Sequence, residues 1–495
     1  MAVKKVCGIE TEYGIHHLGG DNPVSSSSML VSAYVADLER AGWDFEDESP
    51  GNDARGYTRE GAMPPAVETH LVNAVLTSGA RYYVDHAHPE LSTPECSDAL
   101  ELVRYDKAGE EVLRRSMVAV NRILPDGQRI TVYKNNSDSK GNSYGCHENY
   151  LMDRALPFAR LADQVTSHFV TRQVYTGAGK VGSEAGGSHA REVTYQISQR
   201  SEFFEETIGL ETTLKRPIVN TRDEPHADPK RYRRFHVIVG DANLCEVATF
   251  LKVGTTALVL SMIEDDALGN VELRLSRPVQ AIRQISYDLS MREPVELVDG
   301  RTAGALDIQW ELHRLARKYA DERGLDSVGG EGVGREILRR WEEVLHGLET
   351  DPSAVARQVD WAAKLQLIEA YRDRHGIGWD DHRLAALDLQ YHDLRPERSL
   401  FARLDAERLV EEESVMAAVV QPPRSTRAYF RGECLRRFPG AVNSANWDSL
   451  VFDVGTGPLQ RVPMMDPLRG TAEHTEALLD GSTSASELLE RLSAG

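Results

Sequence analysis

The sequence predicts an α+β protein with one large domain followed by one small C-terminal domain. Short β-rich runs separated by loops fill the first third of the chain, whereas residues 306–415 carry apolar residues at helical spacing. The composition changes again after QPPRST at 421–426. We therefore expect domains at 1–422 and 423–495, in a chain of 495 residues that is long enough to bury a sizeable core.

The expected elements can be placed along the chain. Strands are expected in VKKVCGIETEYGI and at 81–85, 129–135 and 235–240, and helices at 29–41 and in SASELLERLSAG. The last of these begins with Ser–x–x–Glu, which fits a capping box. Residues 43–65 are polar, acidic and rich in Gly and Pro. They predict a long connection without regular structure, and such loops are usually functional or disordered.

Composition excludes several classes of protein. The net charge is −20, from 77 acidic and 57 basic residues, which argues against a nucleic-acid surface. No apolar run approaches the roughly 20 residues of a membrane span, and the N-terminus lacks the apolar core of a secretory signal. Five widely spaced cysteines, never in a CxxC pair, are typical of reduced buried thiols. We expect a cytoplasmic protein with neither nucleic-acid nor membrane partners.

The stretch GIETEYG places two glutamates two residues apart. Strand side chains alternate, so Glu10 and Glu12 face the same side. Carboxylates this close repel one another unless solvent or a cation screens them. An exposed acidic face of a strand is the simplest interpretation of this pair, but the apolar neighbours Val6 and Ile9 favour a cation site.

The stretch RYYVDHAHPE concentrates ligand-type and acid/base residues at the end of a strand. Tyr83 and Asp85 share a face, and Pro89 should end the strand or create a bulge near His86. A bulge would swing Glu90 back toward Asp85. Each residue alone fits a cap or turn, but that explanation is weaker for the whole cluster.

Two histidines extend the ligand set. His147 is expected to open a helix after a Gly-rich turn, and His236 lies in the strand FHVIVG. A lone histidine beside apolar residues is more often a core residue. Carboxylates combined with imidazoles, however, favour magnesium or manganese over zinc. Phosphate oxygens commonly complete the coordination shell of protein-bound Mg²⁺, so this set of residues points to a bound nucleoside triphosphate.

A phosphate site would have to be built without a standard glycine-rich loop. The sequence has no GxxxxGK[ST], and GAGKVG at 177–182 is more typical of an ordinary loop. Arg200 and Arg222 could pair with a phosphate or a substrate carboxylate, although surface salt bridges explain them equally well.

These stretches together resemble the actinobacterial Pup deamidase/depupylase family. The motifs are GIETEYG, ARYYVDHAHPE, SYGCHENYL, SQRSEFFE, VNTRDEPHAD, RYRRFHVIVGDANL, LKVGTTALVL and AYFRGECLRRF, and they run in order almost from end to end. The family is homologous to the Pup ligase and similar in fold to glutamine synthetase and the γ-glutamyl-cysteine ligases. The resemblance implies a curved, mostly antiparallel sheet that cradles ATP and Mg²⁺ and is backed by helices.

The resemblance also implies roles for individual residues. Glu10, Tyr83 and Glu90 match one magnesium site, and Glu12, His147 and His236 match the positions around the other metal. Asp85 matches the catalytic aspartate, Arg222 and Trp447 match positions near the nucleotide, and Arg200 matches a position near Pup. Because Pup is acidic and this chain carries −20, we expect a local basic groove near Arg200 and Arg231, Arg233 and Arg234 that orders Pup as a helix.

The implied activity is hydrolysis of an amide at the C-terminal residue of Pup. The bond is either the side-chain amide of a terminal glutamine or the isopeptide bond to a lysine of a pupylated protein. Asp85 would attack the carbonyl itself or activate a water, and phosphate derived from ATP is a third candidate nucleophile. ATP would serve as a bound cofactor rather than as fuel.

Two features favour the depupylase over the ligase. The spacing DHAHPE has one residue fewer between Asp85 and Glu90 than the ligase pattern, and residues 43–65 resemble the mobile loop that the ligase lacks. By contrast, the segment at 134–151, KNNSDSKGNSYGCHENYL, is closer to the ligase sequence pattern. A Pup ligase, a small-molecule γ-glutamyl ligase and a silent Pup-binding adaptor remain the alternatives. The intact set of Glu10, Asp85 and Glu90 argues against the adaptor.

Overall fold

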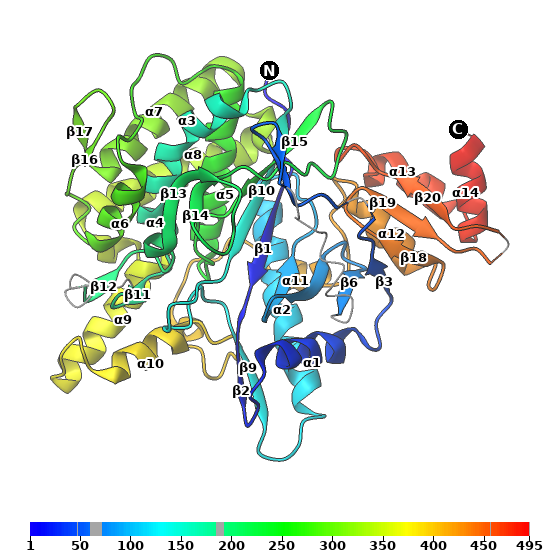
Figure 1. The fold of residues 1–495 in the computed structure, drawn as a ribbon, viewed down its shortest axis with the longest axis horizontal. Helices are drawn as coiled ribbons and strands as arrows, with labels where there is room; N and C mark the ends of the chain where they lie inside the picture. The colour runs from blue at the N-terminus through cyan, green and yellow to red at the C-terminus, as the bar shows by residue number, and fades with distance from the viewer. Residues whose placement is uncertain (47, 60–71, 185–192, 456, 495) are drawn as a thin grey trace.

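The centre of the protein is a ten-stranded sheet that curls and is backed by helices (Figure 1). The computed structural model describes residues 1–46, 48–59, 72–184, 193–455 and 457–494. The strand order is β15 (Tyr232–Val237), β10 (Cys146–Asp153), β1 (Cys7–Glu12), β8 (His88–Ser92), β7 (Arg81–Asp85), β6 (Asn73–Leu76), β3 (Arg40–Trp43), β18 (Val442–Ala445), β19 (Ser449–Phe452) and β20 (Gln460–Pro463). Neighbouring strands run antiparallel in the described part of this sheet, except for the parallel pair β3 and β18. The predicted α+β fold with a mostly antiparallel sheet is confirmed.

Alternation along the strands separates an apolar face of the sheet from a polar one. Ile9, Leu91 and Tyr82 are buried in the main core. The hydroxyl of Tyr82 donates to Ser116 at 3.1 Å, and its ring lies 5.9 Å from the ring of Tyr34. Two helices, α1 (Pro23–Val35) and α2 (Ala99–Asn121), therefore cover this face, and the alternate side chains project to the other side.

The large unit has further helices, several of which contact one central helix. They are α3 (Phe158–Thr171), α4 (Gln173–Thr176), α5 (Glu246–Glu264), α6 (Pro278–Tyr287), α7 (Ala305–Arg323), α8 (Gly330–Thr350), α9 (Asp360–His375), α10 (His382–Tyr391) and α11 (Glu412–Ala418). The expected helical character of 306–415 is confirmed. Among the described residues, α5 is the one helix long and apolar enough to cross a membrane, yet it is buried throughout and touches α2, α3, α7 and α8. We interpret it as a core helix.

The C-terminal part of the chain forms a second core. It contains α12 (Ala428–Arg437), strands β18 to β20, α13 (Ala472–Asp480) and α14 (Ala485–Ala494), drawn in orange and red in Figure 1. Phe430, Leu450 and Leu488 are buried here together with Trp43 of β3. At the start of α14, Ser484 accepts a hydrogen bond from the Glu487 amide at 3.2 Å, as a capping box requires. The Glu487 carboxylate turns to Thr483 instead.

Three expected elements differ in the structure. The first strand is broken at Tyr13, whose amide donates to Pro89 O, and the chain continues as a separate strand that joins another ribbon. The helix expected at 29–41 begins at Pro23, because the side chain of Asn22 caps the amide of Ser25 and proline suits the first turn. It ends at Val35, and residues 40 and 41 belong to β3 instead. The helix expected to begin at His147 is wrong: β10 runs through that position and pairs on both sides.

The segment 43–65 contains more structure than expected. Two-residue strands form there, and the buried carboxylate of Asp53 accepts hydrogen bonds from Arg55 and from Thr221 at 2.6 Å. These contacts dock the segment beside β14. Residues 47 and 60–65 lie outside the described residues.

The two-stranded ribbons are β2 (Gly14–Leu18) with β9 (Arg129–Tyr133), β4 (Asn52–Asp53) with β5 (Tyr57–Thr58), β11 (Lys180–Val181) with β12 (Tyr195–Gln196), β13 (Phe204–Gly209) with β14 (Arg216–Asn220), and β16 (Val295–Glu296) with β17 (Thr302–Ala303).

Candidate active site

The polar face of the sheet gathers side chains from five neighbouring strands. In antiparallel pairs, residues directly opposite each other place their side chains on the same face. The register pairs Glu10 with His147 and Ser92, Glu90 with Glu12 and Tyr83, and Asn149 with His236. The structure therefore brings together all seven candidate catalytic and metal residues on β15, β10, β1, β8 and β7. They are Glu10, Glu12, Tyr83, Asp85, Glu90, His147 and His236.

One group of ligand atoms lies between β1, β10 and β15. Glu10, His147 and His236 each offer an atom within 4.8 Å of the others. Nδ1 of His147 is 3.6 Å from Oε2 of Glu10, and the two imidazole rings meet edge-on at 5.2 Å. One carboxylate and two imidazoles in this arrangement can hold a divalent cation.

The protonation of this group suits a cation. Burial opposes ionisation of Glu10, but the adjacent imidazole of His147 and the charge of Arg234 outweigh it and hold the pKa of Glu10 well below its usual range. Burial lowers the pKa of His236 well below its usual range, so its imidazole is neutral with a lone pair available. Asn149 donates to Glu10 at 2.8 Å and accepts from Arg234 at 2.6 Å, which fixes the carboxylate from one side.

A second group of carboxylates lies between β1, β8 and β7. Burial raises the pKa of Glu90 well above its usual range, and the charges of Asp85 and Glu12 add to the effect. Burial also opposes ionisation of Glu12, yet the His88 imidazole, with Nδ1 3.3 Å from Oε2 of Glu12, and other nearby positive charge lower its pKa to about 2. The Gly145 amide donates to Glu12 at 2.8 Å. Like charges this close favour a shared cation that would let Glu90 ionise.

The turn that follows β7 places Asp85 at the edge of this group. β7 ends at Asp85 and β8 begins at His88, so the strand ends where proline predicted it would. The expected bulge is absent here: Tyr83 stands directly opposite Glu90 in a regular hairpin register. Regular pairing, rather than a bulge, brings Glu90 near Asp85. The Asp85 side chain is 37% exposed and can be reached by a substrate.

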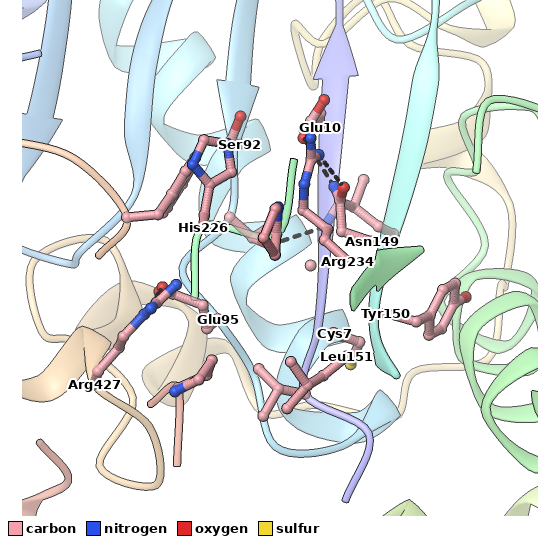
Figure 2. A pocket seen from close by; sticks show the side chains of 17 residues that line it. Cys7, Glu10, Ser92, Glu95, Asn149, Tyr150, Leu151, His226, Arg234 and Arg427 are labelled. Atoms are coloured by element: carbon pink, nitrogen blue, oxygen red, sulfur yellow. Dashed lines mark hydrogen bonds and ion pairs between the residues drawn. The ribbon is translucent and has the colours of Figure 1, made fainter. Parts of the chain in front are cut away.

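A cavity extends from the ligand group toward the C-terminal unit (Figure 2). Its lining includes Glu10 and Arg234 from the sheet and Arg427, Trp447 and Pro467 from the C-terminal part. It also contains His226, whose pKa burial lowers to about 3. The cavity thus joins a carboxylate–imidazole group to arginines and an aromatic ring.

Trp447 contacts the sheet through an edge-on ring pair and neighbouring guanidinium groups. Its ring meets Trp43 edge-on at 5.4 Å, and the Arg431 guanidinium lies 5.1 Å from the ring centre. Arg81 lies 3.8 Å from the Trp43 ring centre and 4.0 Å from that of Tyr83. Sequence reasoning missed Arg81, although it shares the face of Tyr83 by the same alternation.

The predicted arginines occupy different environments. Arg222 donates to Glu224 at 3.0 Å, and Arg234 lies on the polar face with its Nε bonded to Glu224 O. Arg200 is only 1% exposed and donates to Ser143 and to backbone carbonyls. Burial lowers its pKa to about 10.

The expected basic groove needs correction. Arg233 points to the opposite side of β15 from Arg234 and donates to Leu156 O at 2.7 Å from a buried position. Arg231 is exposed and paired with Asp466 of the C-terminal part at 3.0 Å. Because strand side chains alternate, neighbouring arginines in RYRRF cannot line one groove.

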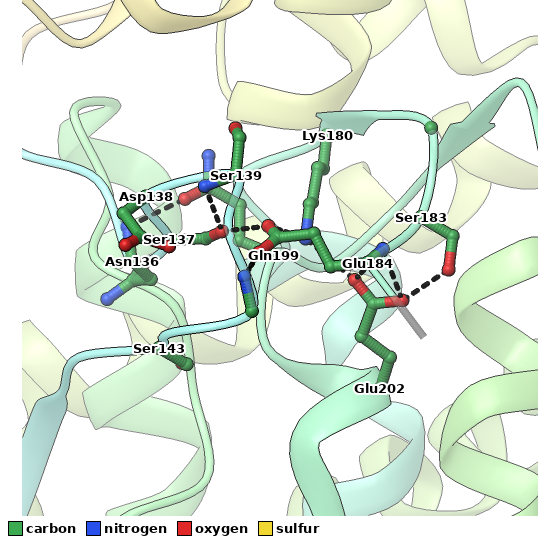
Figure 3. A network of polar contacts seen from close by, with 12 residues as sticks. Asn136, Ser137, Asp138, Ser139, Ser143, Lys180, Ser183, Glu184, Gln199 and Glu202 are labelled. Atoms are coloured by element: carbon green, nitrogen blue, oxygen red, sulfur yellow. Dashed lines mark hydrogen bonds and ion pairs between the residues drawn. The ribbon is translucent and has the colours of Figure 1, made fainter. Parts of the chain in front are cut away.

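A polar network fixes the loop that leads into β10 (Figure 3). The Glu184 carboxylate accepts from Ser137 and from the Gly141 amide, and the Gln199 side chain accepts from the Asn136 amide at 2.7 Å. Ser143, at the end of this loop, receives the bond from Arg200. The network therefore holds the chain immediately before Gly145 and His147.

Comparison with known proteins gives a consistent pattern. A family described as Pup-ligase protein matches residues 5–451. A depupylase of Acidothermus cellulolyticus is 50% identical over 509 residues, covering 99% of each chain. A Pup deamidase/depupylase of Mycobacterium tuberculosis is 47% identical over 511 residues with the same coverage. A Pup–protein ligase of Nocardioides sp. is 42% identical, over 83% of this chain and 90% of its own.

Two solved structures resemble the whole fold. The complex between Pup and its ligase PafA contains a chain that superposes with a TM-score of 0.81 at 33% identity, covering 99% of this chain and 93% of that one. PafA in complex with ADP superposes with a TM-score of 0.73 at 36% identity, covering 82% and 89%.

Proposed function

The chain belongs to the Pup-ligase protein family, and from this premise we propose that it is the hydrolytic member that acts on Pup. It deamidates the C-terminal glutamine of Pup and cleaves the isopeptide bond between Pup and lysines of pupylated proteins. The choice rests on sequence similarity to depupylases over the whole length of the chain. The depupylases match the chain from end to end, whereas the ligase match is less identical and leaves about a sixth of the chain uncovered.

The polar face has the groups that amide hydrolysis needs. We propose Asp85 as the catalytic carboxylate, because it combines an accessible position with a place beside the carboxylate group of Glu90 and Glu12. It would attack the carbonyl or take a proton from the attacking water. Arg234 instead faces the other ligand group, with Nη1 3.7 Å from Oε1 of Glu10, and we assign it to the nucleotide phosphates.

The donor sets fit divalent magnesium. Glu10, His147 and His236 would hold one ion, and Glu12, Glu90 and Tyr83 would surround a second. This grouping exchanges Glu10 and Glu12 relative to the one that the resemblance implied. Carboxylate oxygens with imidazole are suitable ligands for magnesium. A bound ion supplies charge that polarises the scissile carbonyl.

We propose that the cavity beside this group takes the nucleotide. A homologue was solved with ADP, and nucleotide binding follows for this fold. We propose ATP as the nucleotide, with its base near Trp447 and its phosphates toward Arg222 and Arg234. The cavity lining supports this arrangement, since Trp447 and Arg234 border the same space.

Pup would approach from the open side of the polar face. Among the arginines expected to meet Pup, Arg231 offers an exposed positive charge, whereas Arg234 borders the cavity that we assign to the nucleotide. Arg200 and Arg233 are buried, so we assign them to positioning of the loop before β10 and of β15 rather than to direct contact with Pup.

Two further assignments complete the proposal. We divide the chain into a catalytic domain, 1–422, and a C-terminal domain, 423–495, consistent with the separate second core around Phe430 and Leu450. We place the protein in the cytoplasm, where pupylated proteins would meet it.

The proposal is tested by incubating the protein with Mg-ATP and Pup that ends in glutamine. We expect release of ammonia and conversion of the terminal glutamine to glutamate, and mass spectrometry of Pup measures this conversion. Unchanged Pup under conditions in which a depupylase from a relative is active would contradict the proposed function.

A further inference from the structure

The carboxylate of Asp85 is bonded to the histidine that follows it in the chain. Nδ1 of His86 lies 2.8 Å from Oδ2 of Asp85. The His86 side chain is 64% exposed, so burial does not force the imidazole into this position. A hydrogen bond at this distance fixes one of the two carboxylate oxygens.

The backbone at His86 is unusual for a histidine. His86 is the first residue of the two-residue turn between β7 and β8, and its φ is 51°. A positive φ at that position favours glycine, because a Cβ atom is strained there. Non-glycine residues in such conformations cluster at functional sites. The turn is also tied to α1, since Ser27 donates to Ala87 O at 2.8 Å.

We propose that His86 is a positioning residue for Asp85, an inference that rests on the proposed function. Asp85 ends its strand and is partly exposed, so without a partner its carboxylate can rotate. The imidazole N–H holds Oδ2 and leaves Oδ1 to act on the scissile amide or on the attacking water. Orientation of this kind acts on the rate of the chemical step more than on substrate binding.

The test is His86→Gly, because glycine removes the imidazole and also relieves the strained backbone. The variant should therefore fold as well as the natural protein and melt at the same or a higher temperature. In steady-state cleavage of a Pup conjugate, we expect kcat to fall about 10- to 100-fold with KM within about twofold. His86→Asn tolerates positive φ and can donate an amide N–H to Asp85, so it should recover part of the rate.

Asp266→Gly is the matched control. Asp266 also has a positive φ, of 56°, but it lies beyond the end of α5 on another part of the surface. That variant should retain the natural rate.

The outcomes separate the inference from the proposed function. Natural protein that cleaves the conjugate, together with His86→Gly that cleaves it equally fast, would overturn the positioning role. So would equal losses in the glycine and asparagine variants accompanied by a lower melting temperature, because that pattern marks a purely structural residue. Natural protein without cleavage would overturn the proposed function itself.

Discussion

Glu10 of β1 and His147 of β10 face each other across the sheet, with Nδ1 of the histidine 3.6 Å from Oε2 of the glutamate. His236 completes this group from the next strand. The three residues are more than a hundred positions apart at the extremes, and β-sheet register alone brings them together.

The first prediction concerns the cation at this group. His147→Ala should weaken binding of Mn²⁺, used as a probe for Mg²⁺, by roughly 10- to 100-fold because one ligand is lost. Calorimetric titration of the protein without nucleotide measures this directly. His16→Ala, an exposed histidine on β2, is the control. Equal Mn²⁺ affinity in the two variants would show that His147 is not a ligand.

A second prediction separates chemistry from binding at Asp85. Asp85→Asn should abolish cleavage of the Pup amide, because an amide side chain neither attacks the carbonyl nor takes a proton from water. Nucleotide affinity should stay largely intact, since Asp85 does not line the cavity that reaches Trp447. Cleavage that persists in this variant would remove Asp85 from the catalytic role.

Trp447 provides a test of the nucleotide site. Loss of an aromatic ring that stacks on a base costs about 1–3 kcal/mol, so Trp447→Ala should raise the dissociation constant of ATP by roughly 5- to 100-fold. Fluorescence competition with a labelled nucleotide is a suitable measurement. Trp379→Ala removes a half-buried tryptophan that packs against Tyr195 and serves as the comparison. An unchanged constant in the Trp447 variant would place the base elsewhere.

The attachment of the C-terminal unit should depend on pH through Glu95. Burial opposes ionisation of this carboxylate, but Arg431 and then Arg427 outweigh it and lower its pKa to about 2, from 4.5 in the unfolded chain. Between these values the unfolded state binds more protons, so the stability that Glu95 contributes is present above pH 4.5 and is lost as pH falls toward about 2. Glu95→Gln should therefore cost about 3 kcal/mol near neutral pH, and the difference should narrow in acid.

Urea unfolding of both proteins at a series of pH values checks this prediction. Glu476→Gln, which breaks the exposed pair with Arg424 in the same unit, should change stability little at any pH. A difference between natural protein and Glu95→Gln that stays constant into acid would rule out the ionised Glu95 as its source.

Local sequence rules predicted part of this site and missed another part. Period-two alternation placed Glu10 on the same face as Glu12, and Pro89 predicted the end of β7 near His86, because both features depend on neighbours in the chain. The same alternation applied to RYRRF places Arg233 and Arg234 on opposite faces of the strand, and it therefore excludes the expected groove. Asn149 could not be found this way: its bond to Glu10 depends on the pairing of β1 with β10, strands separated by more than a hundred residues.

The fold follows the same division. The α+β class and the helical region after residue 306 could be predicted, because the spacing of apolar residues along a segment indicates whether it forms a helix or a strand. The continuation of one sheet into the C-terminal unit could not, because it rests on the parallel pair of β3 with β18, about 400 positions apart.

One measurement tests the hydrolase assignment most directly. A purified Pup–protein conjugate is incubated with Mg-ATP, and free Pup, free target protein and ADP are quantified together. The account predicts release of Pup and target with little ADP formed per bond cleaved. Stable conjugate, together with new conjugates and stoichiometric ADP when glutamate-ended Pup is supplied, would contradict it and identify a ligase.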